Sequence, residues 1–141
     1  MNNEIIRELI TTALETRKRS YSPYSKYAVG AAVLAESGSL YCGCNIENAS
    51  YGATVCAERV AIFAAVAAGE EKIKAVAVVG GPADVRDVMP DEASPCGICR
   101  QVMREFGDPA EMEIIIAKSI NDYRIFKLAE LLPESFGPEN L

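Results

Sequence analysis

The chain has 141 residues, of which 50% are hydrophobic and 24% charged, a composition typical of one folded domain and unlike that of a disordered chain. It contains no histidine, which excludes histidine-based catalytic triads, histidine general bases and histidine metal ligands. Its 14 Lys and Arg against 20 Asp and Glu give a formal net charge of −6, which disfavours binding to nucleic acids and anionic membranes.

The apolar pattern along the chain alternates between helical and extended periods. Apolar residues recur at helical spacing in the first segment, and short apolar runs bounded by glycine, serine or proline are typical of strands. In chain order we expect a helix over 4–14, a β-hairpin over 28–35 and 40–46, a helix over 57–68, a strand over 73–79 that ends at Gly80-Gly81-Pro82, a helix over about 96–106, strands over 112–117 and 123–126, and a helical turn over 128–132.

The strands that begin at Ala28, Ile73 and Met112 are apolar on both faces, so helices should cover both sides of the sheet. We therefore expect an α/β fold, a three-layer α/β/α sandwich, with residues 1–141 forming a single domain.

The longest uncharged apolar run, residues 60–69, is too short to span a membrane. The N-terminus lacks the basic and apolar regions of a secretory signal, so we expect a cytoplasmic protein.

Cysteines are the most informative residues. In a reducing compartment, five cysteines favour burial, catalysis or metal binding over disulfides. Pro95 precedes the C-x-x-C segment 96–99, and proline favours the start of a helix, which would place both thiols in its first turn. A helix N-terminus lowers thiol pKa values and so favours thiolates. A C-x-x-C segment by itself fits both zinc sites and thioredoxin-like redox sites.

Cys56 opens the alanine-rich helix, with Glu58 two residues later. At a helix N-terminus both side chains can face a ligand that lies beyond the end of the helix. Two helix N-termini that carry thiols could converge on one cation, and three thiolates leave the fourth position of zinc open, as in catalytic zinc sites. The alternative is a structural four-cysteine site made by Cys42 and Cys44 with the C-x-x-C pair, which would leave Cys56 free.

The segment Cys56-Ala57-Glu58 together with Pro95-Cys96-Gly97-Ile98-Cys99 resembles the signature of zinc-dependent nucleoside and nucleobase deaminases. The segments 43–51, 99–107 and 131–138 resemble the small homotetrameric cytidine deaminases more specifically. The resemblance extends from Ser22-Pro23-Tyr24-Ser25 to the C-terminal tail, and it implies a mixed, mostly five-stranded sheet. The loop of residues 81–95 is longer than we expect for that family.

The resemblance implies one zinc ion per chain, held by three cysteines, and hydrolytic deamination of cytidine and deoxycytidine to uridine and deoxyuridine. It assigns Glu58 as the general acid and base, against the alternative of a first-turn glutamate that only interacts with the helix dipole. The zinc ligands it implies are Cys56, Cys96 and Cys99, and the substrate-binding residues are Tyr27 at the pyrimidine, Asn45 and Glu47 at the ribose, Ala49, Ala57, and Tyr51 and Phe136 contributed to a neighbouring subunit's site.

Arginines near the cysteines could balance the charge of the thiolates. Arg59 lies three residues after Cys56 and can reach its thiolate, although a surface ion pair is the alternative; Arg100, next to Cys99, is open to the same interpretation.

The expected partners are a small nucleoside and other copies of the chain in a homotetramer, but neither nucleic acid nor membrane. Alternative functions are a blasticidin-type deaminase and a non-catalytic binding module stabilised by zinc.

The helix after Cys56 also bears on assembly, because small residues on one helix face allow close approach of another element. Such a stripe could equally pack on the chain's own sheet. The stripe comprises Ala57, Ala61, Ala64, Ala65 and Ala68.

Overall fold

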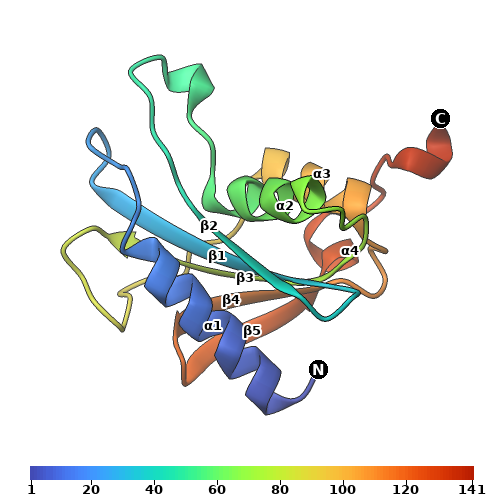
Figure 1. Cartoon of the computed structure of the whole chain (residues 1–141), viewed down its shortest axis with the longest axis horizontal. Coiled ribbons are helices and arrows are strands. Elements are labelled where there is room, and N and C mark those ends of the chain that lie inside the picture. Colours follow the sequence, from blue (N-terminus) through green and yellow to red (C-terminus); the bar gives the residue numbers. More distant parts are fainter.

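A five-stranded mixed sheet forms the middle of the molecule in the computed structural model, which describes all residues from Met1 to Leu141 (Figure 1). The strand order is β2-β1-β3-β4-β5, in which β3 and β4 are parallel and the other neighbours are antiparallel. The strands are β1 (Tyr27–Ala35), β2 (Leu40–Cys44), β3 (Ile73–Pro82), β4 (Glu113–Ser119) and β5 (Asp122–Lys127).

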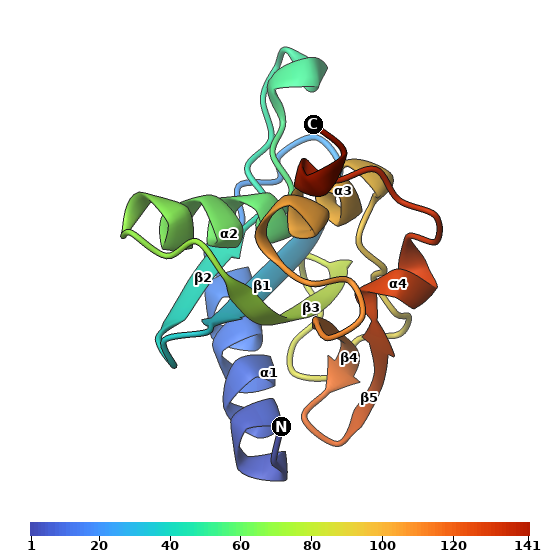
Figure 2. The same cartoon turned by 90° about the vertical axis from the view of Figure 1, so that its right-hand side faces the viewer.

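Helices cover both faces of this sheet, which confirms the predicted three-layer α/β/α sandwich. Helix α1 lies on one face, and α2 and α3 lie on the other, with the short α4 beside them (Figures 1 and 2). None of the helices combines the length and apolar character needed to cross a bilayer. The helical elements are α1 (Asn3–Arg17), α2 (Ala57–Ala67), α3 (Gly97–Phe106), α4 (Leu128–Leu131) and the single 3₁₀ turns η1 (Tyr51–Ala53) and η2 (Pro138–Asn140).

Alternate residues of the central strands pack into two separate hydrophobic clusters, one on each face. Val76 and Val78 of β3 belong to the cluster under α2 and α3, whereas Ala77 and Val79 belong to the cluster under α1. This division follows from the two-residue period of a strand. It explains why β3 reads as a continuous apolar run, as expected for a strand buried on both faces.

The end of β3 differs from the prediction. We expected glycines 80 and 81 to stop the strand, but β3 continues to Pro82, which pairs with Tyr27 of β1. A Cβ at Gly80 would lie 2.8 Å from the Cβ of Ala93, and one at Gly81 would lie 2.7 Å from the Sδ of Met89. The glycines therefore make room for the loop that follows β3 and do not break the strand.

Small residues also set the spacing between helices and sheet. A Cβ at Gly30 of β1 would clash with the Ala13 carbonyl oxygen of α1, and one at Gly43 of β2 would lie 2.9 Å from the Ala57 carbonyl oxygen of α2. Both helices therefore pack unusually close to their strands. Ala57, Ala61 and Ala65 are fully buried, so this part of the alanine stripe packs inside the chain; Ala64 and Ala68 are exposed.

Arg17, in the last turn of α1, is buried and joins three parts of the fold. Its Nε donates to the Ala28 carbonyl of β1 at 2.8 Å, and its Nη1 donates to the Val85 carbonyl at 2.7 Å. Its Nη2 donates to the carbonyls of Gly81 at 2.9 Å and Pro82 at 2.6 Å. Burial lowers the pKa of Arg17, and the partial negative charge at the C-terminal end of α1 favours the cation there.

Replacing Arg17 should therefore destabilise the whole domain. We expect Arg17→Met to lower the free energy of unfolding by about 3 kcal/mol, because several buried carbonyls lose their donor. Urea denaturation followed by circular dichroism measures this change. Lys18→Met is the matched control, since Lys18 is exposed and pairs only with Glu15; that variant should change stability by less than about 0.5 kcal/mol. Equal effects of the two substitutions would contradict this role of Arg17.

Candidate metal centre and active site

Two helix N-termini bring the predicted cysteines together. Cys56 is the N-cap residue of α2 and Cys96 is the N-cap residue of α3, both with extended backbone conformations. Cys99 lies in the first turn of α3, where its backbone N–H donates to the Sγ of Cys96 at 3.4 Å. The Cys96 side chain therefore caps α3 by accepting from an otherwise unpaired N–H group of the first turn, whereas the Cys56 side chain makes no such hydrogen bond at α2.

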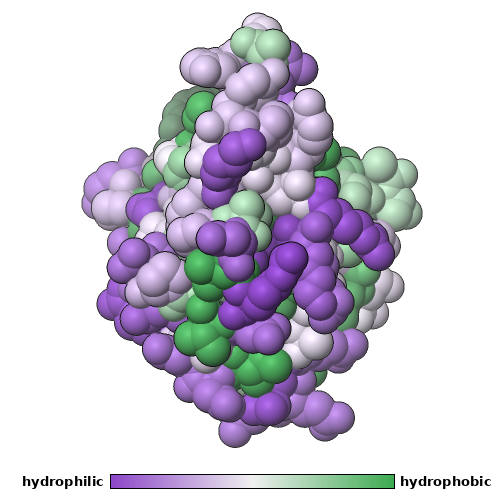
Figure 3. Space-filling model, turned by 90° about the vertical axis from the view of Figure 1, so that its left-hand side faces the viewer, coloured by the Kyte–Doolittle hydropathy of each residue, from purple (hydrophilic) through white to green (hydrophobic).

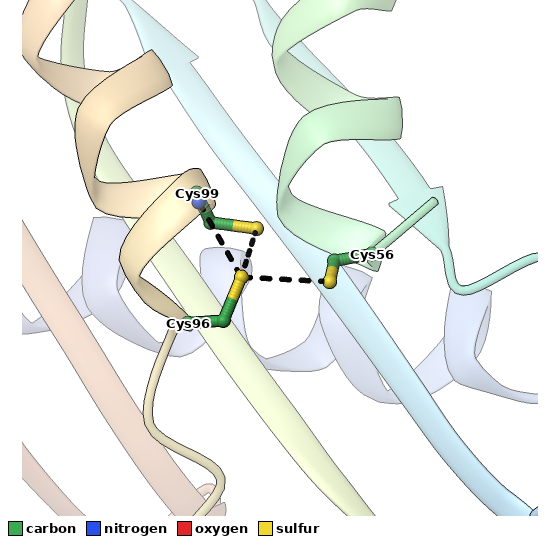
Figure 4. A group of neighbouring side chains, drawn as sticks. All are labelled: Cys56, Cys96 and Cys99. Atoms are coloured by element: carbon green, nitrogen blue, oxygen red, sulfur yellow. Dashed lines mark hydrogen bonds between the residues drawn. The ribbon is translucent and has the colours of Figure 1, made fainter. Parts of the chain in front are cut away.

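The three sulfur atoms point toward one another (Figure 4). The Sγ of Cys96 lies 3.8 Å from that of Cys56 and 3.4 Å from that of Cys99, and all three sulfurs lie within 4.8 Å of one another. Tetrahedral zinc with Zn–S bonds of about 2.3 Å holds its sulfur ligands about 3.8 Å apart, so the spacing fits this metal. Three sulfur ligands leave one position of a tetrahedral ion for water or substrate.

The basic group nearest the sulfurs is Arg59, whose Nη2 donates to the Sγ of Cys56 at 3.5 Å. The pKa of Cys56 is lowered to about 5, chiefly by the neighbouring Cys99 thiol and further by Arg59, although burial acts in the opposite direction. The pKa of Arg59 is raised, mainly by Cys56. The Nη2 contact with Cys56 places this guanidinium at the sulfur cluster, and its Nε is buried without a hydrogen-bond partner. Arg59 is therefore not part of a surface ion pair with an acidic side chain.

Arg100 does not share this position. Its Nε donates to the Pro95 carbonyl at 2.8 Å and its Nη1 to the Leu131 carbonyl at 2.7 Å. Arg100 therefore ties the residue before Cys96 to the end of α4, and of the two candidate arginines only Arg59 contacts a thiol.

Glu58, in the first turn of α2, is 4% exposed. Burial raises the pKa of its carboxyl group to about 7, and the nearby Cys56 thiolate acts in the same direction. A carboxyl group with a pKa near neutrality can both accept and release a proton, which is the property a general acid and base needs.

A cavity of about 390 Å³ opens beside the sulfur cluster. This volume is large enough for a small ligand of nucleoside size. Figure 3 shows the left-hand side of the molecule in Figure 1, from which the loop after β3 projects. Hydrophilic residues cover most of this side. The lining residues are Tyr27, Val29, Asn45, Thr54, Cys56, Ala57, Glu58, Val78, Glu92, Ala93, Ser94 and Cys96.

Asn45 and Glu47 lie in adjoining cavities, since Glu47 lines a second hollow of about 360 Å³ that shares Thr54 with the first. The Oδ1 of Asn45 accepts from the Val29 backbone N–H at 2.9 Å, and its Nδ2 donates to the Tyr27 carbonyl at 2.8 Å. One N–H of that amide remains for a ligand.

Glu47 is held by the turn that precedes β1. Its Oε1 accepts from the backbone N–H groups of Tyr24 at 3.0 Å and Ser25 at 3.1 Å, and its Oε2 accepts from the Ser25 hydroxyl. These hydrogen bonds, with that from the hydroxyl as the largest cause, lower the pKa of Glu47. Its carboxylate is therefore ionised and fixed in position.

The remaining predicted substrate residues lie farther from the sulfurs. Tyr51 is 77% exposed in the second hollow, with its ring centroid 5.9 Å from that of Tyr24. Phe136 is 57% exposed on the C-terminal tail, and Ala49 is exposed in the protruding segment between β2 and α2. None of these three lines the cavity beside the cysteines.

Several lining residues had no sequence signal of their own. Val78 lies near the end of β3, and Glu92, Ala93 and Ser94 precede the C-x-x-C segment. Only the position of residues 92–94, just before a predicted helix N-terminus that carries thiols, could have suggested these three residues; Val78 had no such signal.

Comparison with known proteins agrees with this geometry. Residues 3–115 match the family model described as the cytidine and deoxycytidylate deaminase zinc-binding region. The chain belongs to this family. It is 44% identical over 136 residues to a cytidine deaminase of Sporosarcina psychrophila, and the matched region covers 96% of this chain and 94% of that protein. A cytidine deaminase of Halalkalibacterium halodurans is also 44% identical, over 94% of this chain and 95% of its own length.

Solved structures agree as well. The crystal structure of cytidine deaminase from Burkholderia pseudomallei superposes with a TM-score of 0.82 at 40% identity, covering 96% of this chain and all of that one. That of the Mycobacterium tuberculosis cytidine deaminase gives a TM-score of 0.75 at 39% identity, over 92% of this chain and 95% of that chain. The mixed five-stranded sheet is therefore the fold of this deaminase family, as the sequence resemblance implied.

Zinc is the cofactor of this deaminase domain, and the three converging thiols are ligands that fit zinc. Cys42 and Cys44 lie on β2 outside the group of converging thiols, which argues against the four-cysteine alternative.

The geometry predicts which cysteines matter for metal binding. Cys56→Ala should lower the zinc content of the purified deaminase well below one ion per chain, because it removes one of the three converging thiols. Cys44→Ala is the control and should keep the zinc content of the unaltered protein. Elemental analysis of both variants measures the difference. Zinc loss in Cys44→Ala together with retention in Cys56→Ala would favour the structural four-cysteine site.

Proposed function

We propose that this protein catalyses the hydrolytic deamination of free cytidine and deoxycytidine, giving uridine or deoxyuridine and ammonia. The observation that carries the proposal is the convergence of three thiols and one buried carboxyl group at a single cavity of nucleoside size. The cytidine deaminases to which the chain is similar span nearly its whole length, which supports the same activity here. In this proposal residues 1–141 form one cytidine deaminase domain.

Cys56, Cys96 and Cys99 are the zinc ligands in this proposal. Bound zinc supplies a Lewis acid that makes a water molecule more acidic. Arg59 offsets part of the negative charge of three thiolates, which would otherwise weaken that acidity. The backbone N–H groups near Ala57 and Cys96 stabilise negative charge that develops at the two helix N-termini.

Glu58 moves the protons. Its carboxylate takes a proton from the attacking water and passes it to N3 of the pyrimidine as oxygen adds to C4. The same carboxylate then takes the proton of the hydroxyl group formed at C4 and transfers it to the amino group, so that C4 keeps a carbonyl oxygen and the amino group leaves as ammonia. A buried carboxyl group with a pKa near 7 is suited to both directions of transfer.

The remaining residues of the site hold the nucleoside. Tyr27 lies along the cavity wall, where its ring would pack on the pyrimidine. The free amide N–H of Asn45 and the ionised carboxylate of Glu47 supply a donor and an acceptor for the ribose hydroxyls. Ala49 and Ala57 complete this set from the protruding segment and from the start of α2.

A free nucleoside is the proposed substrate because the acidic chain has no basic cluster that would hold a nucleotide or RNA. Deamination of cytidine would serve pyrimidine salvage. The alternatives are a deaminase for another cytosine-like compound, such as a blasticidin-type substrate, and a zinc-stabilised binding module. Ultraviolet absorbance with cytidine, with and without a chelator, tests the proposed function against both alternatives: only a cytidine deaminase converts cytidine and loses activity with the chelator.

We also propose a homotetramer in which each active site receives residues from a neighbouring copy. Tyr51 and Phe136 support this assignment, because both are exposed and lie outside the cavity of their own chain.

We propose a cytoplasmic location, since a site of three free thiols needs a reducing compartment.

Glu58→Gln tests the proton-transfer role. We expect this variant to keep its fold and zinc content but to lose at least about 10²–10⁴-fold in turnover of cytidine. The control is Glu105→Gln on α3, which is exposed and should keep full activity. Absorbance assays, circular dichroism and zinc analysis provide the three readouts. Turnover by Glu58→Gln close to that of the unaltered enzyme would exclude the mechanism.

Mixing two inactive variants tests the shared site. Glu58→Gln and Tyr51→Ala are each expected to be poorly active alone. Refolding or co-expressing them together should raise activity above the average of the two parents, because some sites then combine Glu58 of one chain with Tyr51 of another. Size-exclusion chromatography and differential tagging identify the mixed oligomers. Activity at the parental average in such oligomers would mean that each chain carries a complete site.

A further inference from the structure

The loop of residues 83–95, between β3 and α3, forms one wall of the cavity. Its last residues, Glu92, Ala93 and Ser94, line the cavity directly before Cys96. A loop of this length is commonly a mobile lid. Here the chain's own contacts hold it at its beginning, its middle and its end.

The first two contacts are buried. Arg17 binds the carbonyls of Pro82 and Val85, where the loop leaves β3. Met89, in the middle, is 2% exposed, and its backbone N–H donates to the Lys118 carbonyl of β4 at 2.8 Å. These contacts attach the first part of the loop to the sheet.

The third contact is an ion pair at the cavity. The Nε and Nη2 of Arg124, on β5, each donate to one carboxylate oxygen of Glu92 at 2.8 Å. The Arg124 guanidinium also lies 4.9 Å from the ring centroid of Phe126 on the same strand. A planar two-point contact fixes direction as well as distance, and the aromatic ring further orients the guanidinium.

The position of this wall affects the space available to a pyrimidine. Gly80 lies beneath both Ala93 and Tyr27, since a Cβ at Gly80 would be 2.8 Å from the Cβ of Ala93 and 3.2 Å from the Cε2 of Tyr27. Ala93 follows Glu92 directly. A shift of Glu92 would therefore move the residue that faces the Tyr27 side of the cavity.

We infer that Arg124 is a positioning residue for nucleoside binding, acting through Glu92 on the cavity wall. This inference rests on the proposed function, because it takes the cavity as the nucleoside site. Arg124 itself does not line the cavity. Its loss leaves Glu58, the cysteines and Arg59 untouched, so binding changes while the chemical step does not.

Arg124→Leu tests the inference. The KM for cytidine should rise about three- to fivefold, the range of a well-oriented exposed ion pair, whereas kcat should stay within about twofold and zinc content should not change. The dissociation constant of uridine, measured by calorimetry, should rise by the same factor. Lys127→Leu is the matched control: it removes one cation from the same strand, and its ammonium group contacts only the Glu111 carbonyl at 3.5 Å.

Two further measurements separate positioning from general destabilisation. In a double-mutant cycle, Glu92→Gln combined with Arg124→Leu should raise KM no more than Arg124→Leu alone, because both substitutions remove the same ion pair between Arg124 and Glu92. Arg124→Lys should give an intermediate KM, since it keeps the charge but not the two-point geometry. Raising the salt concentration should increase the KM of the unaltered enzyme and leave that of Arg124→Leu nearly constant.

The inference fails if Arg124→Leu leaves both KM and the uridine dissociation constant at the values of the unaltered enzyme. It also fails if Lys127→Leu raises KM as much as Arg124→Leu does. A double variant whose increase in KM is the product of the increases caused by Glu92→Gln and by Arg124→Leu would contradict it as well. A fall in kcat with unchanged KM would also overturn it. The proposed function fails in a different way, since the unaltered enzyme would then not convert cytidine at all.

Discussion

The site depends on one constraint: two helices from separate parts of the chain must begin at the same point in space. Helix α2 follows β2, which ends at Cys44 opposite Gly30 of β1, and β3 ends opposite Tyr27, near the same end of β1. The segments that lead to Cys56 and Cys96 therefore leave the same edge of the sheet. Because β3 and β4 are parallel, α3 has to cross over the sheet between them, and its N-terminus remains at that edge.

The same arrangement accounts for the electrostatics of the site. The N-termini of α2 and α3 both favour negative charge, and the Arg59 guanidinium adds a full positive charge at Cys56. The Cys56 thiolate is thereby stabilised without histidine or lysine beside it. Glu58 lies in the same first turn but is buried, so desolvation keeps its proton affinity high while Cys56 ionises readily. One helix end thus supports a thiolate and a carboxyl group with opposite pKa shifts.

Local patterns predicted the parts of the molecule that depend on neighbours in sequence. Helical periodicity predicted α1, and the C-x-x-C spacing after Pro95 predicted two thiols in the first turn of one helix, since helix turns are local properties. The grouping of Cys56 with these two thiols was implied by the resemblance to the deaminase family, because 40 residues separate Cys56 from Cys96. The end of β3 was predicted wrongly, because glycines at 80 and 81 break strands only when no partner strand continues beside them. The contacts of Arg17 and Arg124 join residues far apart in the chain and leave no local signal; the shape of the cavity wall could not be inferred from sequence.

Among the residues of the proposed site, some are positioned by contacts within the chain and others are left exposed. The sulfur cluster, Glu58 and the wall of residues 92–94 are fixed by internal contacts, whereas the rings of Tyr51 and Phe136 remain exposed. Phe136 is nevertheless held in place: Gln101 donates to its carbonyl at 2.9 Å, and Arg104 binds Ser135 and Glu139 on either side of it. Its ring gains little burial within its own chain, but the backbone that carries it is already held in place for contact with another surface, which lowers the entropic cost of association. The placement of the tail therefore supports the proposed homotetramer, in which a neighbouring copy would cover the ring of Phe136.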